Sequence, residues 1–420
     1  MAAGPVVREG VFKHNSGIVQ ATGHQRAGTP AEPAPRRRIM IVAGEASGDL
    51  HGSDLAARIL ARAPEVEMFG IAGARMRAAG VHALFRIEDI HGMGLAELAS
   101  TIAGTTRKLF ALRAILRNDP PDLLIVIDFA EFNMVLAGMA KRAGVPVLYY
   151  VTPQVWAWRR RRISKIIDRA DRLAVVLPFE KDLYARAGER VAFVGHPLLD
   201  RVTAVHPRAE TLARHGFKPD ARLLAILPGS RRAEIRYLLR PMVAAARVLC
   251  RDHNLVPAIC LAPTLTPAEL EREGRTGLSG IRIIEGDTYS ILAVSEAALV
   301  ASGTATLETA LLGCPMVIVY KAARLTYALG RMLVTGVDYI GMPNILAGRQ
   351  IVPELIQGRV NEQNLVRAVE PLLSGRIRAE TVAQLRAIRA QLGAPGAAAR
   401  VAEIALGMMK PKMIEADQSA

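Results

Sequence analysis

The chain has 420 residues, of which 51% are hydrophobic, and its 54 Lys and Arg against 39 Asp and Glu give a net charge of +15. This length and apolar content support a large core and favour two domains over one. The three cysteines have no C-x-x-C spacing, so a zinc site or a disulfide framework is not expected, and no apolar run reaches the roughly 18 residues of a membrane span. The basic balance points to anionic partners, which are nucleic acid, anionic lipid or phosphorylated substrates.

Strand and helix patterns alternate along the first half of the chain. Residues 1–37 are rich in Gly, Ala and Pro and have no signal-peptide core, so we expect a disordered tail there. Short apolar runs that end in glycine or proline then alternate with helical patterns, which predicts a parallel, doubly wound sheet. The strand candidates are 38–44, 66–73, 121–129, 145–153, 172–179 and 190–197.

The same alternation restarts near residue 221, after a polar and turn-rich stretch. Further strand candidates lie at 222–230, 256–263, 281–286, 297–304 and 315–321. We therefore predict an α/β protein with two Rossmann-like domains, whose ligand site lies at the carboxyl ends of the strands. The expected boundaries are a tail at 1–37, a first domain at 38–205, a second domain at 206–380, and helices at 381–420 that pack back on the first domain.

Two acidic residues follow apolar strands of the first domain. Glu45 stands at a strand tip in "AGEASGDLHG", where the glycines alone are explained by a tight turn into a helix. Asp128 ends the apolar strand of "VIDFAEFN", where a carboxylate is costly unless it is paired or used. Asp128 either caps the next helix or acts as a general base that accepts a proton from a hydroxyl. Glu131 and Asn133 follow it within one turn.

Three loops of the second domain carry groups that suit a nucleotide sugar. In "LPGSRR", Ser230 and Arg231 offer backbone N–H groups and a guanidinium to a phosphate, although an exposed basic turn would look the same. In "ASGTATLE", Ser302, Gly303 and Thr304 open a helix, and Glu308 can accept hydrogen bonds from a ribose diol. In "IGMPNILAG", Asn344 is either a turn residue or a contact to a sugar or diphosphate.

Two stretches combine apolar and basic residues. "VTPQVWAWRRRR" holds both tryptophans, Trp156 and Trp158, followed by four arginines. The rings either shape an apolar wall and brace a loop near the site, or pack beneath the domain interface. The stretch 90–117 carries leucines and arginines at mixed helical spacing, which predicts an amphipathic helix pair on the sheet or a surface that dips into anionic lipid.

Taken together and in this order, these segments resemble the lipid-A-disaccharide synthases, a family of glycosyltransferases in lipid A biosynthesis. The matching motifs span about residues 38 to 350, and the tryptophan motif is the most distinctive of them. They are "GEASGD" at 44–49, "PQVWAWR" at 153–159, "LPFEK" at 177–181, "VGHP" at 194–197, "LPGSR" at 227–231, "ASGTATLE" at 301–308 and "PNILAGR" at 343–349.

The resemblance implies a GT-B fold and an inverting, metal-independent transfer with no cofactor. The donor would be UDP-2,3-diacylglucosamine and the acceptor 2,3-diacylglucosamine 1-phosphate, which give a β-1,6-linked disaccharide 1-phosphate and UDP. It also implies a cytoplasmic enzyme on the inner face of the membrane, and a homodimer is expected through the resemblance alone.

The resemblance also distributes roles among the residues. Asp128 is the expected base, Glu45 a second acid on the acceptor side, and Arg231 the group that neutralises the departing diphosphate. Ser302, Gly303 and Thr304 would hold the diphosphate, Glu308 the ribose, and Asn344 the donor site. One departure is Glu131-Phe132-Asn133, where the family pattern has Asp-Phe-Asn, so Glu131 remains a second candidate for the base.

Other functions are compatible with parts of this pattern. Another GT-B enzyme, such as a peptidoglycan precursor transferase or a UDP-N-acetylglucosamine 2-epimerase, would share the second-domain loops but would not need the tryptophan-arginine loop. A nucleic-acid-binding protein would explain the positive charge, but the basic residues are scattered and no RNA- or DNA-binding motif is present. We therefore expect no nucleic-acid partner.

Overall fold

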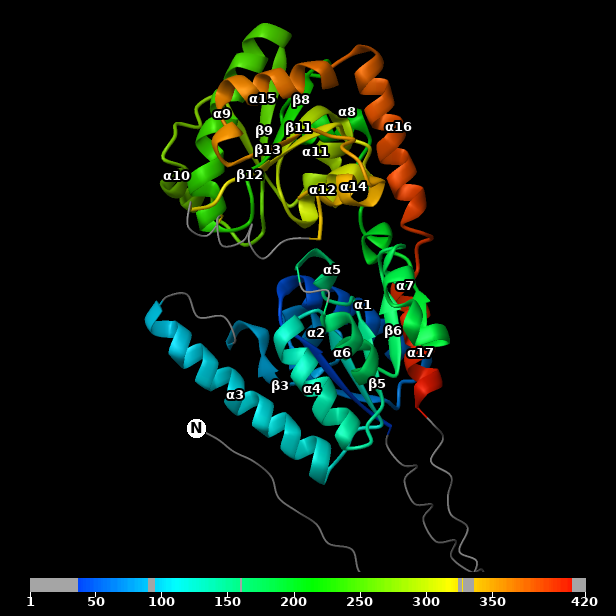
Figure 1. Cartoon of the computed structure of the whole chain (residues 1–420). Coiled ribbons are helices and arrows are strands. Elements are labelled where there is room, and N and C mark those ends of the chain that lie inside the picture. The colour runs from blue at the N-terminus through cyan, green and yellow to red at the C-terminus, as the bar shows by residue number, and fades with distance from the viewer. Residues whose placement is uncertain (1–36, 90–94, 159–160, 324–326, 328–335, 410–420) are drawn as a thin grey trace, which may run out of the picture. The chain divides into compact units, whose positions relative to one another are not determined.

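The computed structural model describes residues 37–89, 95–158, 161–323, 327 and 336–409. Two fully parallel sheets carry the strands, and helices connect them along the chain (Figure 1). The prediction of an α/β protein with two Rossmann-like domains is confirmed. The predicted disordered tail lies outside the described residues, except for Arg37.

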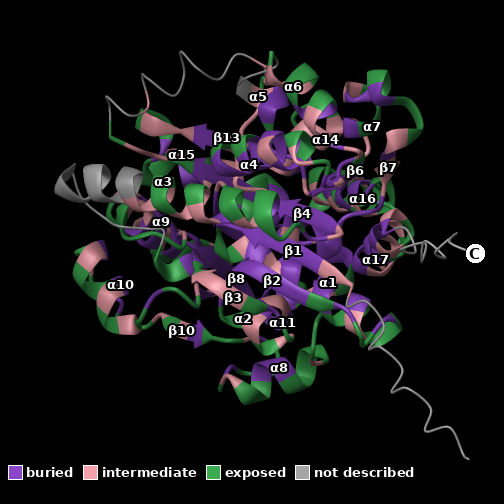
Figure 2. Ribbon diagram, turned by 90° about the horizontal axis from the view of Figure 1, so that it is seen from below, coloured by how far each residue is buried: buried purple, intermediate pink, exposed green. Residues whose placement is uncertain are grey.

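The first sheet has seven strands in the order β3-β2-β1-β4-β5-β6-β7. Its central strands are buried on both faces, as Figure 2 shows for β1 and β4, and this explains their continuous aliphatic sequences. The strands are β1 (Arg38–Ala43), β2 (Glu67–Ala72), β3 (His82–Arg86), β4 (Leu123–Ile127), β5 (Val147–Tyr150), β6 (Arg172–Val175) and β7 (Val191–Phe193).

Helices follow most strands of this sheet. Within the described residues the last helix, α17 (Ala397–Met408), packs against the first, α1 (Ala46–Arg62). Arg62 pairs with Glu403 across that contact at 2.8 Å. The other helices here are α2 (Ala74–Ala78), α3 (Leu95–Asn118), α4 (Ala130–Arg142), α5 (Val155–Trp158), α6 (Arg162–Arg169) and α7 (Glu180–Leu183).

The second sheet has six strands in the order β10-β9-β8-β11-β12-β13. They are β8 (Arg222–Leu227), β9 (Leu255–Leu261), β10 (Arg282–Glu285), β11 (Ser295–Ala301), β12 (Met316–Tyr320) and β13 (Glu354–Ile356). The helices are α8 (Arg208–Arg214), α9 (Arg232–His253), α10 (Pro267–Gly274), α11 (Thr288–Val294), α12 (Thr304–Leu311), α14 (Met342–Ala347), α15 (Glu362–Val369) and α16 (Gly375–Gln391).

The structure differs from the sequence prediction in three elements. Strands β3 and β13 are short edge strands that apolar patterning did not reveal, because edge strands are only partly buried. Where an amphipathic helix pair was predicted, residues 95–118 form one continuous helix, α3. Within the described ranges, no helix is long and apolar enough to cross a membrane.

Candidate functional site

Strand register brings the functional residues of the first domain to one edge of the sheet. Ala43 pairs with Ile127, and Ile127 pairs with Tyr150, so β1, β4 and β5 end at the same level. The next residues along the chain are Gly44, Asp128 and Val151. The sequence predicted that Glu45 and Asp128 each follow an apolar strand, and the strand order places those two strands, β1 and β4, side by side.

Gly44 leaves room for an aromatic ring beside Asp128. A Cβ at Gly44 would lie 2.1 Å from the ring of Phe129, so only glycine allows this ring to cover the turn. Phe129 in turn stacks on Phe132, with ring centroids 5.1 Å apart. Gly44 is thus required by close packing, and its presence is not evidence for a phosphate-binding loop.

Asp49 in the same motif caps a neighbouring helix. Its carboxylate accepts hydrogen bonds from the backbone N–H groups of Arg75 and Met76, both at 3.0 Å, at the start of α2. Gly73 faces this carboxylate so closely that a Cβ would lie 2.4 Å from it. Asp49 therefore caps α2, although it lies within α1.

The backbone of Asp128 is fixed on every side. Its N–H donates to the carbonyl of Val151 at 3.2 Å, and its own carbonyl accepts from the Tyr149 hydroxyl at 3.1 Å and from Asn133 Nδ2 at 2.8 Å. Asn133 is 0% exposed and also donates to Ile127. Asn133 therefore positions Asp128 from within the core, and its Nδ2 is occupied by these two bonds.

Strained backbone accompanies this arrangement. Asp128, Phe129 and Val151 have φ angles of +48°, +46° and +55°, in the left-handed region that disfavours side chains. For the β-branched Val151 this is a marked outlier. Each such residue costs on the order of 1–3 kcal/mol, and strain of this kind clusters at functional sites.

The side chain of Asp128 has the protonation behaviour of a general base that works near neutral pH. Burial, together with the negative charge of Glu45, raises the pKa of Asp128 to about 6, and a hydrogen bond from the Phe129 backbone opposes the shift. Glu45 itself is exposed at the N-cap of α1. A carboxylate with a pKa near the working pH accepts a proton effectively.

Glu131 is placed differently from Asp128. Its side chain is 62% exposed and pairs with Arg162 at 2.5 Å. Because its side chain is exposed to solvent, Glu131 lacks the desolvation that raises the pKa of Asp128. Of the two acids, Asp128 is the more buried.

The tryptophan loop forms a short helix, α5, directly after β5. Trp156 is 4% exposed and packs edge-on against Phe179, with ring centroids 5.0 Å apart. Its ring therefore belongs to the core of the first domain and braces the loop. The side chain of Trp158 and residues Arg159 and Arg160 lie outside the described part of the chain.

In the second domain, Ser302, Gly303 and Thr304 follow β11 and open α12. Gly303 has a φ of +148° with open space where a Cβ would be, and both Gly303 and Thr304 are exposed. Ser302 Oγ donates to the carbonyl of Ile340 at 3.2 Å, which ties this loop to the segment before α14. An exposed helix start with small residues suits a phosphate group.

Glu308 lies one turn into α12 and has a partner that the sequence analysis missed. The hydroxyl of Tyr289 donates to Glu308 Oε1 at 2.9 Å. Burial raises the pKa of Glu308, and the bond from Tyr289 works against that shift. One carboxylate oxygen is thus held by Tyr289.

The loop after β8 differs from the expected anion site in one respect. The backbone N–H groups of Ser230 and Arg231 are not free, because both donate to Glu234 Oε2, at 2.9 and 3.3 Å. This capping box fixes the start of α9. The Arg231 side chain is 78% exposed and pairs only loosely with Glu234 at 3.6 Å. The guanidinium, rather than the loop backbone, is the group available to an anion here.

Asn344 forms an internal latch. It is 0% exposed, its Oδ1 accepts from the N–H groups of Ile351 and Val352, and its Nδ2 donates to the Val352 carbonyl and to Glu354. Glu354 also accepts from the N–H groups that precede α14. These four hydrogen bonds hold α14 against the segment that leads into β13. They use the side-chain oxygen and the N–H groups of Asn344 that would otherwise bind a ligand.

Sequence reasoning missed several residues of this site because they signal their role only through contacts. In the sequence, nothing distinguishes Tyr149 from other strand residues, Val151 from other loop residues or Tyr289 from other helix residues. Their contacts become visible only in the folded structure. Among the residues that the structure describes, no three His, Cys, Asp or Glu side chains come together as a metal site.

Comparison with known proteins gives a family for this chain. The model of the lipid-A-disaccharide synthetase family matches residues 39–405. Lipid-A-disaccharide synthase of Syntrophus aciditrophicus is 44% identical over 377 residues, which cover 89% of this chain and 98% of that protein. The enzyme of the same name from Myxococcus xanthus is 40% identical with the same coverage.

Solved structures with the same fold are more distant. The calicheamicin glycosyltransferase CalG4 superposes with a TM-score of 0.58 at 18% identity, over 89% of this chain and 98% of that one. UDP-GlcNAc 2-epimerase from Neisseria meningitidis, bound to UDP-GlcNAc, gives 0.59 at 12% identity, over 88% and 100%. At these identities the likeness shows the GT-B fold alone.

Proposed function

This chain belongs to the lipid-A-disaccharide synthetase family, and from that premise we propose that it transfers a 2,3-diacylglucosamine unit from UDP to 2,3-diacylglucosamine 1-phosphate. It is a glycosyltransferase, and the products of this transfer are the β-1,6-linked disaccharide 1-phosphate and UDP. The observation that carries the proposal is Asp128, a partly buried carboxylate at a strand end with a pKa of about 6.

In the proposed reaction, Asp128 accepts the proton of the acceptor's 6-hydroxyl. The hydroxyl oxygen attacks the anomeric carbon of the donor, and the bond from that carbon to the diphosphate breaks with inversion. Arg231 neutralises the charge that develops on the departing UDP, an electrostatic effect worth a few kcal/mol, roughly. The helix start at Gly303 and Thr304 holds the diphosphate, and Glu308 accepts hydrogen bonds from ribose. No step in this scheme requires a metal or another cofactor.

The test is an assay of the purified full chain with UDP-2,3-diacylglucosamine and 2,3-diacylglucosamine 1-phosphate. We expect disaccharide 1-phosphate and an equal amount of UDP to form. Mass spectrometry detects the disaccharide, and an assay of released UDP measures the second product. UDP-N-acetylglucosamine serves as the non-acylated comparison. Turnover of that sugar alone, by transfer or by epimerisation at C2, would overturn the proposal.

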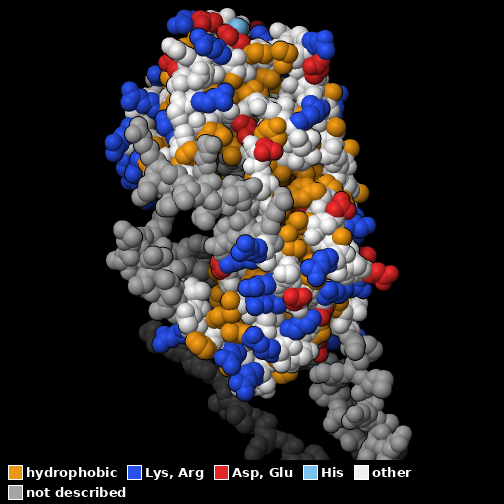
Figure 3. All heavy atoms as spheres, in the orientation of Figure 1, with side chains coloured by type: hydrophobic (Ala, Val, Ile, Leu, Met, Phe, Trp, Pro, Cys, Tyr) orange, Lys and Arg blue, Asp and Glu red, His pale blue; other side chains and the backbone are white. Residues whose placement is uncertain are grey.

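We also propose that the first domain rests on an anionic membrane surface at the cytoplasmic face. Figure 3 shows Lys and Arg side chains gathered with hydrophobic ones over α3, α4 and α6. Exposed members of this basic face are Arg107, Arg113, Arg117, Lys141, Arg142 and Lys165, and Phe110 among them is 59% exposed. Anionic head groups attract such residues by about 1 kcal/mol each.

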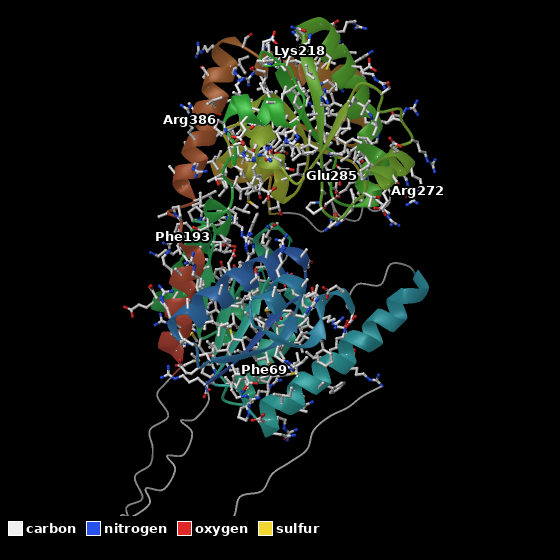
Figure 4. The ribbon with its side chains drawn as sticks, turned by 180° about the vertical axis from the view of Figure 1, so that it is seen from behind. Phe69, Phe193, Lys218, Arg272, Glu285 and Arg386 are labelled. Carbon is white, nitrogen blue, oxygen red and sulfur yellow. The ribbon has the colours of Figure 1, made fainter. Side chains whose placement is uncertain are left out.

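Flotation with vesicles that contain anionic lipid tests this surface. Replacing Arg113 and Arg117 with Ser should reduce the bound fraction. The matched control replaces Lys218 and Arg386, exposed residues of the second domain that Figure 4 labels, and should bind as the parent does. Equal binding by all three proteins would contradict the proposed surface. That the chain forms a homodimer stays a prediction, and sedimentation velocity can check it.

A further inference from the structure

Glu180 is a buried carboxylate that neither the reaction scheme nor the sequence motifs explain. It opens α7 directly after β6, and it is 1% exposed. Its Oε2 accepts from the backbone N–H groups of Val176 and Leu177, at 3.2 and 3.0 Å, and its Oε1 accepts from Thr152 Oγ1 at 3.1 Å. One side chain therefore joins the loops that leave β5 and β6.

The residue that Glu180 holds stands next to the strained turn beside the base. Thr152 follows Val151, whose φ is +55° and whose carbonyl accepts the N–H of Asp128 at 3.2 Å. Val151 is tied on its other side to β6, since its N–H donates to Ala174 at 3.3 Å. A β-branched residue stays in the left-handed region only when its surroundings hold it there.

The burial of Glu180 has a cost that a simple loop contact would not require. Desolvation raises the pKa of Glu180 to about 7, and hydrogen bonds from Leu177, Thr152 and Val176 and the Trp156 side chain act in the opposite direction. A neutral residue could cap two backbone N–H groups without this penalty. The two oxygens of a carboxylate can accept from several donors at once, here Val176, Leu177 and Thr152 from two different loops.

We propose that Glu180 is a positioning residue for the catalytic base, which holds Thr152 and thereby keeps the Val151 turn in the conformation that supports Asp128. This inference rests on the proposed role of Asp128 in the transfer. Glu180 touches neither substrate in this account. It acts through Thr152, Val151 and the backbone of Asp128.

The central experiment compares Glu180→Gln with Thr152→Val and Thr152→Ser in the full chain. Glu180→Gln and Thr152→Val each disturb the hydrogen bond between the two side chains, and we expect kcat to fall about tenfold to a hundredfold, since a misplacement of about 1 Å can cost that much. KM for donor and acceptor should stay within about twofold, because uniform substrate binding is not affected. Thr152→Ser keeps the hydroxyl and should restore kcat.

The double variant measures the coupling directly. If Glu180 acts through Thr152, the combination of Glu180→Gln and Thr152→Val should lower kcat no further than the more severe single change. Additive losses in kcat would show that the two residues act independently, and this would overturn the proposal.

A control residue lies at the opposite end of strand β5. Asp171 accepts the N–H of Val147 at 2.9 Å at the start of β5, and it pairs with Lys141. Asp171→Asn removes a carboxylate from a backbone donor away from the site, at a side chain that is 41% exposed, so the melting temperature should fall while kcat is unchanged. If Glu180→Gln behaves in the same way, with stability lost and kcat kept, Glu180 is only structural.

Two readouts separate failure of this inference from failure of the proposed function. If the parent chain forms no disaccharide, or if Asp128→Asn keeps full activity, the proposed function or the assigned base is wrong. If both hold and Glu180→Gln turns over normally, only the positioning role is wrong. Should Glu180→Gln not fold, the Thr152→Val and Thr152→Ser pair, which keeps the buried carboxylate, decides the question by the presence or absence of the difference in kcat.

Discussion

The charge of Glu45 raises the pKa of Asp128, although the two acids stand at the ends of different strands, β1 and β4. Burial is the larger cause of the shift, and Glu45 adds to it. In the proposed reaction Asp128 must be deprotonated, so kcat/KM should rise with pH through an apparent pKa of about 6. The Glu45→Gln variant should move this acid limb to lower pH, because one source of repulsion is removed.

The measurement is the pH dependence of kcat/KM between about pH 4.5 and 9, which resolves a limb of this kind. Glu65→Gln is the control, because Glu65 is exposed near the far end of α1 and the change in net charge is the same. A limb that stays in place in Glu45→Gln would show that the two carboxylates do not interact in the working enzyme.

Asp128→Asn should abolish disaccharide formation, while Glu131→Gln should keep most of it. Asparagine cannot accept the proton in the transition state, and loss of general-base catalysis typically costs about a hundredfold to ten-thousandfold. Glu131 is exposed and pairs with Arg162 at the surface, so its replacement should leave the proton transfer intact. The reverse result in single-turnover assays would move the base to Glu131.

The same Asp128→Asn variant should be more stable than the parent at pH 8. The folded-state pKa of Asp128 is raised from 3.8 to about 6. Between these values the folded state keeps a proton that the unfolded state has lost, so stability falls as pH rises. Above about pH 6 the cost is fully present, and its removal should increase the free energy of unfolding by about 1–3 kcal/mol.

Denaturant titrations at pH 8 and pH 4 check this, because the gain should disappear toward the lower pH. Glu131→Gln again provides the comparison and should show no such gain. A stability difference that is equal at both pH values would mean that the charge of Asp128 is not the cause.

Tyr289→Phe should weaken donor binding without a comparable loss of kcat. The hydroxyl of Tyr289 holds Glu308 Oε1 at 2.9 Å, and the proposed ribose contact uses the same carboxylate. Losing one hydrogen bond to a charged group costs about 1.5–3 kcal/mol at most, so KM for the donor should rise roughly tenfold. KM for the acceptor is the internal control. An increase in that KM instead would remove Glu308 from the donor site.

Asn344→Ala should lower stability strongly. The change leaves the N–H groups of Ile351 and Val352 without their acceptor and removes a donor from Glu354. Each buried unsatisfied group costs about 1–3 kcal/mol, so the loss in free energy of unfolding should be about 2–5 kcal/mol. Thermal unfolding measures it. A variant that melts normally but has a much higher donor KM would support direct contact between Asn344 and the donor.

The sequence predicted the strands of both sheets well where they are buried on both faces. A run such as Leu123–Ile127 has no polar residue, which is typical of a strand in a parallel sheet covered by helices on both faces. The edge strands β3 and β13 were missed because partial exposure gives them no such pattern. The motif "GEASGD" predicted a turn at a strand end, where the structure places it after β1. It did not reveal the role of its members, since Gly44 makes room for Phe129 and Asp49 caps α2.

By itself, therefore, the sequence determined the fold class, the family resemblance and the strand ends at which polar residues gather, because these depend on local patterns along the chain. Only the tertiary structure decided which of those polar residues is desolvated, which caps a helix and which holds a loop in place. Asp128, Asn133 and Asn344 all lie in polar motifs of the sequence. In the structure, desolvation raises the pKa of Asp128, whereas the side-chain Nδ2 groups of the two asparagines donate to partners inside the protein. Burial and hydrogen-bond partners come from residues distant in the chain, such as Val151, Tyr289 and Glu180, and no local pattern contains them.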